Sequence, residues 1–210
     1  MAANLNGLRR GLVLGAALAA ALASLCACDM NRAGVDKPSF HGVDISGAEY
    51  ARTLNLPDFN GQARTLADFK GKLPVVFFGY TQCPDACPTT MAELAEVKRS
   101  LGADGARVIG VFVTVDPERD SAELLKAYMA NFGADFVGLR GTPEQVLAAA
   151  KEFKVFFAKV PGKTETSYTV DHTAGSYIFD AQGKVRLFTR YGSGAKFLAE
   201  DLKVLLAEKA

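Results

Sequence analysis

The sequence has no tryptophan, only two histidines among its 210 residues, and no run of like charges. Its 24 basic and 23 acidic side chains leave a formal net charge of +1. Nucleic-acid-binding proteins carry a basic patch or stripe, so the lack of one argues against a nucleic-acid partner. Internal repeats and signs of a second domain are also missing. With 49% hydrophobic residues, the chain has enough apolar material for one domain with a proper core.

A hydrophobic run long enough to span a membrane is not found either. The apolar run at residues 11–25 has about 15 residues, whereas a spanning helix needs about 20. It follows Arg9-Arg10, as in a secretory signal peptide. It ends in Leu25-Cys26-Ala27-Cys28, which resembles the bacterial lipobox. We therefore expect residues 1–27 to be a lipoprotein signal peptide, with Cys28 as the acylated first residue of the mature protein.

The residues after Cys28 indicate where the mature protein is held. Asp29 resembles the signal that keeps lipoproteins at the inner membrane of Gram-negative bacteria. Residues 28–39 are polar and contain glycine and proline, which indicates a flexible tether. We expect a domain at residues 40–210, lipid-anchored on the periplasmic side of the inner membrane. An uncleaved membrane anchor would leave this domain on the same side.

Cys83 and Cys87 are then the only thiols left in an oxidising compartment. They follow the apolar run at residues 75–78 and precede a helical pattern that we start at Pro88. Each cysteine is followed by proline, which favours extended backbone and predicts a compact turn between them. Free N–H groups at the helix start should lower the pKa of Cys87 and give it thiolate character.

The two thiols alone allow a structural disulfide, a redox centre or a soft-metal site. A disulfide that closes a loop of three intervening residues would stabilise weakly, because so short a loop loses little chain entropy. The pair also follows a core strand, at the carboxyl end where open α/β sheets usually place their sites. The pattern therefore favours redox or metal chemistry without choosing between them.

The order of the remaining patterns predicts an α/β sandwich with a mixed central sheet flanked by helices. The dithiol after the first buried strand favours a thioredoxin-like fold. Asp120 and Glu123 form an expected capping box, and Thr142 with Pro143 predicts another helix start. The expected strands are 53–58, 75–80, 108–115, 155–160, 167–171, 176–179 and 185–188, and the expected helical segments are 66–69, 88 onward, 120–132, 142–153 and 196 onward. The apolar positions expected on the last helix are Phe197, Leu198, Leu202, Leu205 and Leu206.

Three segments of the domain, about Phe40 to Glu208, resemble the Sco/SenC family. They are Phe78-Gly79-Tyr80-Thr81-Gln82-Cys83-Pro84-Asp85-Ala86-Cys87-Pro88, Thr114-Val115-Asp116-Pro117-Glu118-Arg119-Asp120 and Tyr168-Thr169-Val170-Asp171-His172-Thr173. This family contains lipid- or helix-anchored thioredoxin-like copper proteins that assemble cytochrome c oxidase. The resemblance implies a thioredoxin-like fold with a hairpin or loop inserted before the histidine segment. It also implies Cys83, Cys87 and His172 as copper ligands.

Two functions are compatible with the resemblance. The first is a periplasmic copper chaperone that delivers Cu(I) or Cu(II) to the dinuclear copper site of cytochrome c oxidase subunit II. Its partners would include a periplasmic copper donor and a dithiol reductant. The alternative is an enzyme, a thiol–disulfide oxidoreductase whose redox pair Cys83 and Cys87 reduces the cysteines of that subunit. In the oxidised protein we expect a Cys83–Cys87 disulfide.

His172 discriminates between the two functions. Two thiolates and one imidazole suit Cu(I) and also accept Cu(II), whereas a reductase needs no imidazole. Asp171 is not expected as a fourth ligand, because strand neighbours point to opposite faces. His41 is interpreted as a surface residue. Asp116 ends a core strand near the dithiol, and a supporting role there is left open.

We predict that Cys28 carries a diacylglyceryl group and is the first residue of the mature protein, because a lipobox-like sequence precedes it. Mass spectrometry of the membrane-extracted protein should show a lipidated N-terminal peptide that begins at Cys28. A mature protein with an intact N-terminus at Met1 would contradict this prediction.

Overall fold

A computed structural model of the protein describes residues 39–164 and 167–208, and a compact unit begins at Phe40. The expected signal peptide, the lipidated Cys28 and the tether up to residue 38 lie outside the described residues. Within the described part, no helix combines the length and the apolar character needed to cross a membrane.

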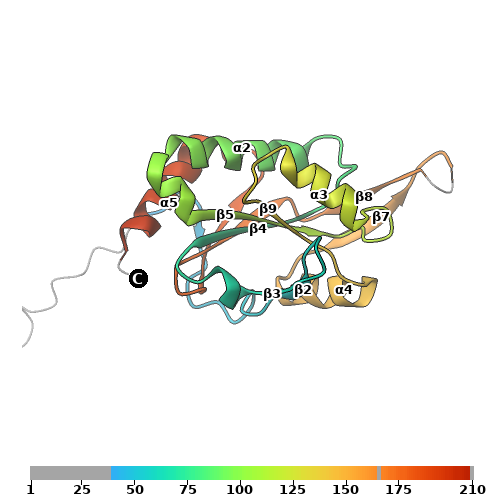
Figure 1. Ribbon diagram of the computed structural model, residues 1–210, viewed down its shortest axis with the longest axis horizontal. Helices are drawn as coiled ribbons and strands as arrows, with labels where there is room; N and C mark the ends of the chain where they lie inside the picture. The colour runs from blue at the N-terminus through green and yellow to red at the C-terminus, as the bar shows by residue number, and fades with distance from the viewer. Residues whose placement is uncertain (1–38, 165–166, 209–210) are drawn as a thin grey trace, which may run out of the picture. The chain divides into compact units, whose positions relative to one another are not determined.

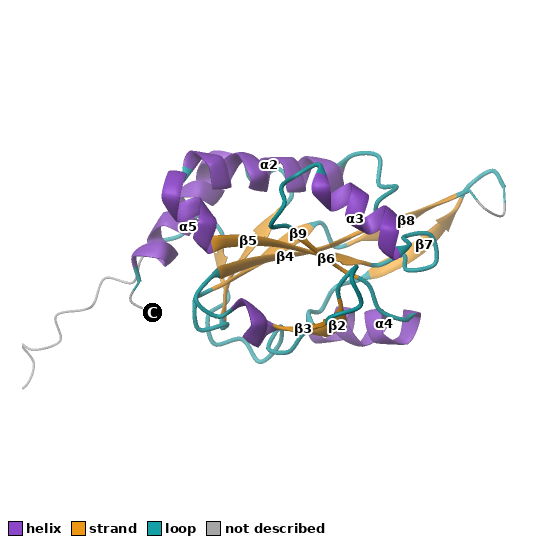
Figure 2. Ribbon diagram, viewed as in Figure 1, coloured by secondary structure: helices purple, strands orange, loops and turns teal. Residues whose placement is uncertain are grey.

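A mixed sheet of six strands forms the centre of this unit (Figures 1 and 2). Three neighbouring strands run parallel, and the other three join by antiparallel pairing. In sheet order the strands are β1 (Val43–Asp44), β10 (Val185–Arg190), β9 (Gly175–Phe179), β4 (Leu73–Gly79), β5 (Val108–Thr114) and β6 (Val137–Leu139). Every residue of β4 and β5 is buried, as expected for near-continuous apolar runs in central parallel strands.

Helices cover both faces of the sheet, so the predicted α/β class with a mixed sheet is confirmed. One face carries α2 (Ala86–Ser100), α3 (Ala122–Ala130) and α5 (Ala195–Ala207) (Figure 1). The other face carries α4 (Pro143–Glu152), the short pair β2 (Asn55–Pro57) and β3 (Ala63–Thr65), and the 3₁₀ turn η1 (Leu66–Phe69). A second 3₁₀ segment, η2 (Gly102–Arg107), leads from α2 to β5.

The hairpin expected before the histidine segment is present. Strands β7 (Phe157–Pro161) and β8 (Tyr168–His172) pair antiparallel with each other as a separate two-stranded sheet. The register places His172, the last residue of β8, opposite Phe157. Figure 1 shows this hairpin projecting from the end of the unit. His172 therefore lies on a hairpin that is not part of the central sheet.

Two helix starts differ from the sequence prediction. Helix α2 begins at Ala86 rather than Pro88, so Cys87 lies inside its first turn. Pro88 is tolerated there because the first four N–H groups of a helix have no partner within the helix. The cap of α3 is Ser121, whose hydroxyl accepts a hydrogen bond from the Leu124 N–H, and not Asp120. Asp120 is instead fully buried.

The other helix predictions agree more closely. Thr142 caps α4 and Pro143 occupies its first position, as predicted. On α5 the three leucines at 202, 205 and 206 are buried, but Phe197 is 44% exposed and stacks on His41. Strands β1, β3 and β6, which have two or three residues each, were not predicted from the sequence.

Candidate metal centre

Three side chains from separate segments meet at the end of β4. Cys83 lies in the loop after β4, Cys87 in the first turn of α2, and His172 at the end of β8. Their ligand atoms all lie within 4.8 Å of one another. In the part of the chain that the structure describes, no other group of three histidine, cysteine or acidic side chains meets this geometry. The predicted ligand set therefore forms one cluster.

The sulfur of Cys87 is buried against the end of β4, where Gly79 leaves room for it. A Cβ atom at position 79 would lie 2.7 Å from the Cys87 Sγ and 2.8 Å from Cε1 of Phe77. Such contacts are too short for any residue with a side chain, so glycine permits this close approach. As a result Cys87 has no exposed surface, whereas Cys83 is half-buried.

Burial raises the pKa of the Cys87 thiol well above its ordinary value, and the nearby Cys83 raises it further. The prediction of a lowered pKa at this position was therefore wrong. Cys87 does lie at a helix start, which favours an anion. The loss of water around a fully buried sulfur outweighs that effect, and Cys87 is a protonated thiol at neutral pH. A metal ion that binds here must displace this proton.

His172 faces the dithiol with one ring nitrogen. Its Nε2 lies 3.4 Å from the Cys87 Sγ. Its Nδ1 lies 3.2 Å from the Thr173 carbonyl oxygen, and a proton on Nδ1 lets it donate there and leaves the Nε2 lone pair toward the sulfur. The rings of Phe77 and Tyr80 meet the imidazole edge-on, at centroid distances of 5.7 and 6.0 Å. Burial lowers the pKa of His172, so the ring is neutral and available as a ligand at neutral pH.

The other singled-out residues lie outside the cluster. Asp171 and His41 are exposed, and His41 contacts Glu200, so the interpretation of His41 as a surface residue is confirmed. Asp116 and Asp120 are buried, yet neither belongs to the ligand group.

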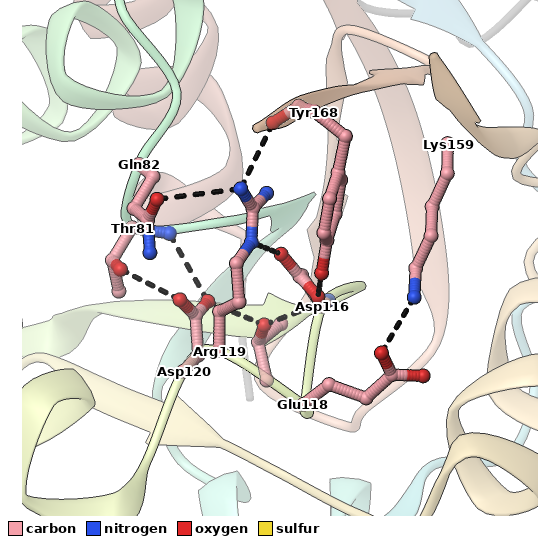
Figure 3. Close-up of polar contacts among 9 residues, drawn as sticks. Thr81, Gln82, Asp116, Glu118, Arg119, Asp120, Lys159 and Tyr168 are labelled. Carbon is pink, nitrogen blue, oxygen red and sulfur yellow. Dashed lines mark hydrogen bonds and ion pairs between the residues drawn. The ribbon is translucent and has the colours of Figure 1, made fainter. Parts of the chain in front are cut away.

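Figure 3 shows the carboxylates of Asp116 and Asp120 in a polar network beside the dithiol loop, by which we mean residues 80–85 between β4 and α2. Asp120 accepts hydrogen bonds from the backbone N–H and hydroxyl of Thr81. Asp116 contacts Arg119 and Tyr168. No functional role was predicted from the sequence for Arg119, Tyr168 or Thr81. All three lie within the segments that carried the family resemblance, and this position is the sequence feature that could have pointed to a role at the site.

The donor set fits one soft metal ion. Two sulfurs and an imidazole are the ligands preferred by Cu(I), and the imidazole also suits Cu(II). Ligand atoms within 4.8 Å of one another can approach a single ion with small adjustments, because metal–sulfur and metal–nitrogen bonds are about 2.0–2.3 Å long. Both cysteines are free in this structure, so their sulfurs are available as ligands.

Comparison with known proteins agrees with this geometry. The SCO1/SenC family model matches residues 44–207, a range that includes all three clustered side chains. A SCO2-like protein of Rickettsia felis is 34% identical over 171 residues, which are 80% of this chain and 83% of the relative. Bradyrhizobium japonicum ScoI with copper bound is 38% identical, with a TM-score of 0.66, over 73% of this chain and 97% of that one. Apo Sco1 from Thermus thermophilus is 34% identical, with a TM-score of 0.71, over 80% and 97% of the two chains.

We predict that Cys87 of the reduced, metal-free protein reacts with iodoacetamide more slowly than Cys83 at neutral pH. Its sulfur is fully buried and protonated, whereas alkylation requires an accessible thiolate. Mass spectrometry of peptides after a short pulse gives both rates. In denaturant, which serves as the control, the two cysteines should react alike. Equal rates in the folded protein would show that burial does not protect Cys87.

Proposed function

The chain belongs to the SCO1/SenC family, and from this we propose that it carries copper to the dinuclear copper site of cytochrome c oxidase subunit II. Proteins of this family act in the copper-dependent assembly of cytochrome c oxidase. The observation that carries the proposal for this chain is the imidazole of His172, whose Nε2 lies 3.4 Å from the Cys87 Sγ.

The proposed site binds one copper ion through the sulfurs of Cys83 and Cys87 and the Nε2 of His172. Cys87 would hold the buried side of the ion, while Cys83 and His172, which are both half-buried, would form the side that a partner reaches first. Such an arrangement suits transfer, because an incoming ligand can replace a half-buried ligand before the buried sulfur of Cys87 releases the ion. A reductase has no use for the imidazole, so its placement supports copper handling over the oxidoreductase alternative.

The proposed setting is the periplasmic side of a bacterial inner membrane, with the protein anchored through a lipid on Cys28. Support for this part comes from the sequence alone, because Cys28 lies outside the described residues. The partners proposed with it are subunit II, a periplasmic copper donor, and a dithiol reductant that keeps both cysteines reduced.

We predict that the reduced protein binds one copper ion and that replacing either cysteine by serine abolishes tight binding. One sulfur and one imidazole cannot hold Cu(I) strongly. His172→Ala should mainly weaken Cu(II), since two thiolates still satisfy Cu(I). His41→Ala is the matched control, because this other histidine is exposed and bound to Glu200.

Metal analysis and competition titration measure these affinities in the purified protein. If His172→Ala bound Cu(II) as tightly as the wild type, the ligand assignment would be wrong. If His172→Ala still reduced the cysteines of subunit II at the wild-type rate while copper transfer was absent in both proteins, the oxidoreductase alternative would replace the proposal.

We predict in addition that oxidation and copper binding exclude each other. Closure of a Cys83–Cys87 disulfide removes two protons and two electrons, which pass to an added disulfide oxidant, and leaves no thiolate for copper. The oxidised protein should bind no copper and regain one-to-one binding after reduction by a dithiol. Copper titration of both forms, with free thiols counted in parallel, measures this. Equal uptake by the two forms would contradict the prediction.

A further inference from the structure

The three ligand-bearing segments do not share one rigid element. The cysteines lie next to β4, in the central sheet, whereas His172 lies on the β7–β8 hairpin, whose strands pair only with each other. At its His172 end the hairpin runs through two residues into β9, which pairs with β4, so the backbone holds this end of β8 near the dithiol. The other end of β8, at Tyr168, pairs only with β7, and side-chain contacts hold this end of the hairpin against the loop that carries Cys83.

Arg119 makes contacts with both of these segments from the turn between β5 and α3. Its Nη1 donates to the side-chain carbonyl of Gln82, the neighbour of Cys83, at 3.3 Å. The same nitrogen donates to the backbone carbonyl of Tyr168, at the start of β8, at 2.8 Å. Figure 3 shows the guanidinium between the dithiol loop and the hairpin. One side chain thus bridges the segments that carry Cys83 and His172.

Asp116 and the ring of Tyr168 hold the guanidinium of Arg119 in place. Its Nε donates to one carboxylate oxygen of Asp116, and the hydroxyl of Tyr168 donates to the other at 2.8 Å. The guanidinium carbon lies 3.5 Å from the centre of the Tyr168 ring, in a stacked cation–π contact. Asp116 is 1% exposed, so solvent and salt screen this pair weakly.

Asp120 connects the dithiol loop to Asp116, the residue that holds Arg119. This carboxylate accepts hydrogen bonds from the N–H and hydroxyl of Thr81, at 3.0 and 2.6 Å, and from the hydroxyl of Thr114 at 2.6 Å. The Thr114 oxygen in turn accepts the N–H of Asp116 at 3.0 Å. One connected hydrogen-bond network therefore joins the loop before Cys83, the end of β5 and Asp116, the residue that binds the guanidinium of Arg119.

One NH₂ group of Arg119 is left without a partner within residues 39–164 and 167–208. We infer that the guanidinium is oriented by its contacts with the two bridged segments and not by pairing all of its donors. Its Nη2 is buried and has no hydrogen-bond partner among the described residues. An unpaired buried donor normally lowers stability, and few are found in native proteins. A lysine could keep the charge beside Asp116, but an ammonium lacks the planar fork that reaches both segments and stacks on Tyr168.

We propose that Arg119 is a positioning residue that holds the His172 hairpin against the dithiol loop. In this role it sets the distance at which the imidazole meets the sulfur of Cys87. The copper part of the test below rests on the proposed function, but the positioning itself does not.

The first experiment uses the metal-free, reduced full chain and compares Arg119→Lys with Arg64→Lys. Arg64 is the matched control, because its Nε also binds a buried aspartate, Asp58 at 2.9 Å, but Arg64 lies on β3 and does not bridge the segments that carry Cys83 and His172 among the described residues. NMR measures the nuclear Overhauser contacts between the His172 ring and the rings of Phe77 and Tyr80. We expect these contacts to weaken or vanish in Arg119→Lys alone. Unchanged contacts in Arg119→Lys would overturn the proposal.

The second experiment measures Cu(II) affinity in a double-mutant cycle with His172→Ala. Mutation of a residue that orients a metal ligand without binding the metal typically lowers metal affinity about 10- to 100-fold. We expect a loss of this size for Arg119→Lys. Because Arg119 acts through His172, the double variant should bind no more weakly than His172→Ala alone. Losses that multiply instead would overturn the positioning role.

Two outcomes remain to be separated. A wild type that binds neither Cu(I) nor Cu(II) would defeat the proposed function, and the metal-free contacts would still decide the positioning role. Should Arg119→Lys fail to fold, Tyr168→Phe takes its place, since it removes only the hydroxyl donor to Asp116. We expect Tyr168→Phe to shift both readouts in the same direction by a smaller amount. No shift in either readout would overturn the proposal.

Discussion

Burial of the Cys87 sulfur at the carboxyl end of β4 is the constraint on which the rest of the site depends. Gly79 leaves the space for this sulfur, and α2 begins early enough to place Cys87 in its first turn. Removal from water keeps the thiol protonated, so a metal ion must displace a proton to bind. The affinity of the proposed copper site is thereby coupled to pH.

The hairpin that carries His172 adds a third candidate ligand to a thioredoxin-like dithiol. Its imidazole is neutral, is enclosed by the edges of two aromatic rings, and presents Nε2 to the sulfur. One end of β8 joins β9 of the central sheet, whereas its other end, at Tyr168, is held against the dithiol loop by side chains. In the proposed arrangement Arg119 does this, and the same fold that elsewhere supports redox chemistry becomes suited to carrying a soft metal ion.

Much of the fold was predictable because its elements carry strong local patterns. The buried strands at β4 and β5, the cap of α4 at Thr142 and the hairpin before His172 all follow from nearby residues. The strands β1, β3 and β6 were not predictable, since two or three residues show no period. Asp120 was mistaken for a cap because its true partner, Thr81, lies 39 residues earlier in the chain.

The sequence by itself determined which ligands are available, since the two thiols and the imidazole are properties of single residues in recognisable segments. It also determined the order of the elements, because helix and strand patterns are local. Only the tertiary structure decided the protonation state of Cys87, the orientation of His172 and the bridging role of Arg119. Each of these depends on burial and on contacts between residues far apart in the chain, and no local pattern contains that information.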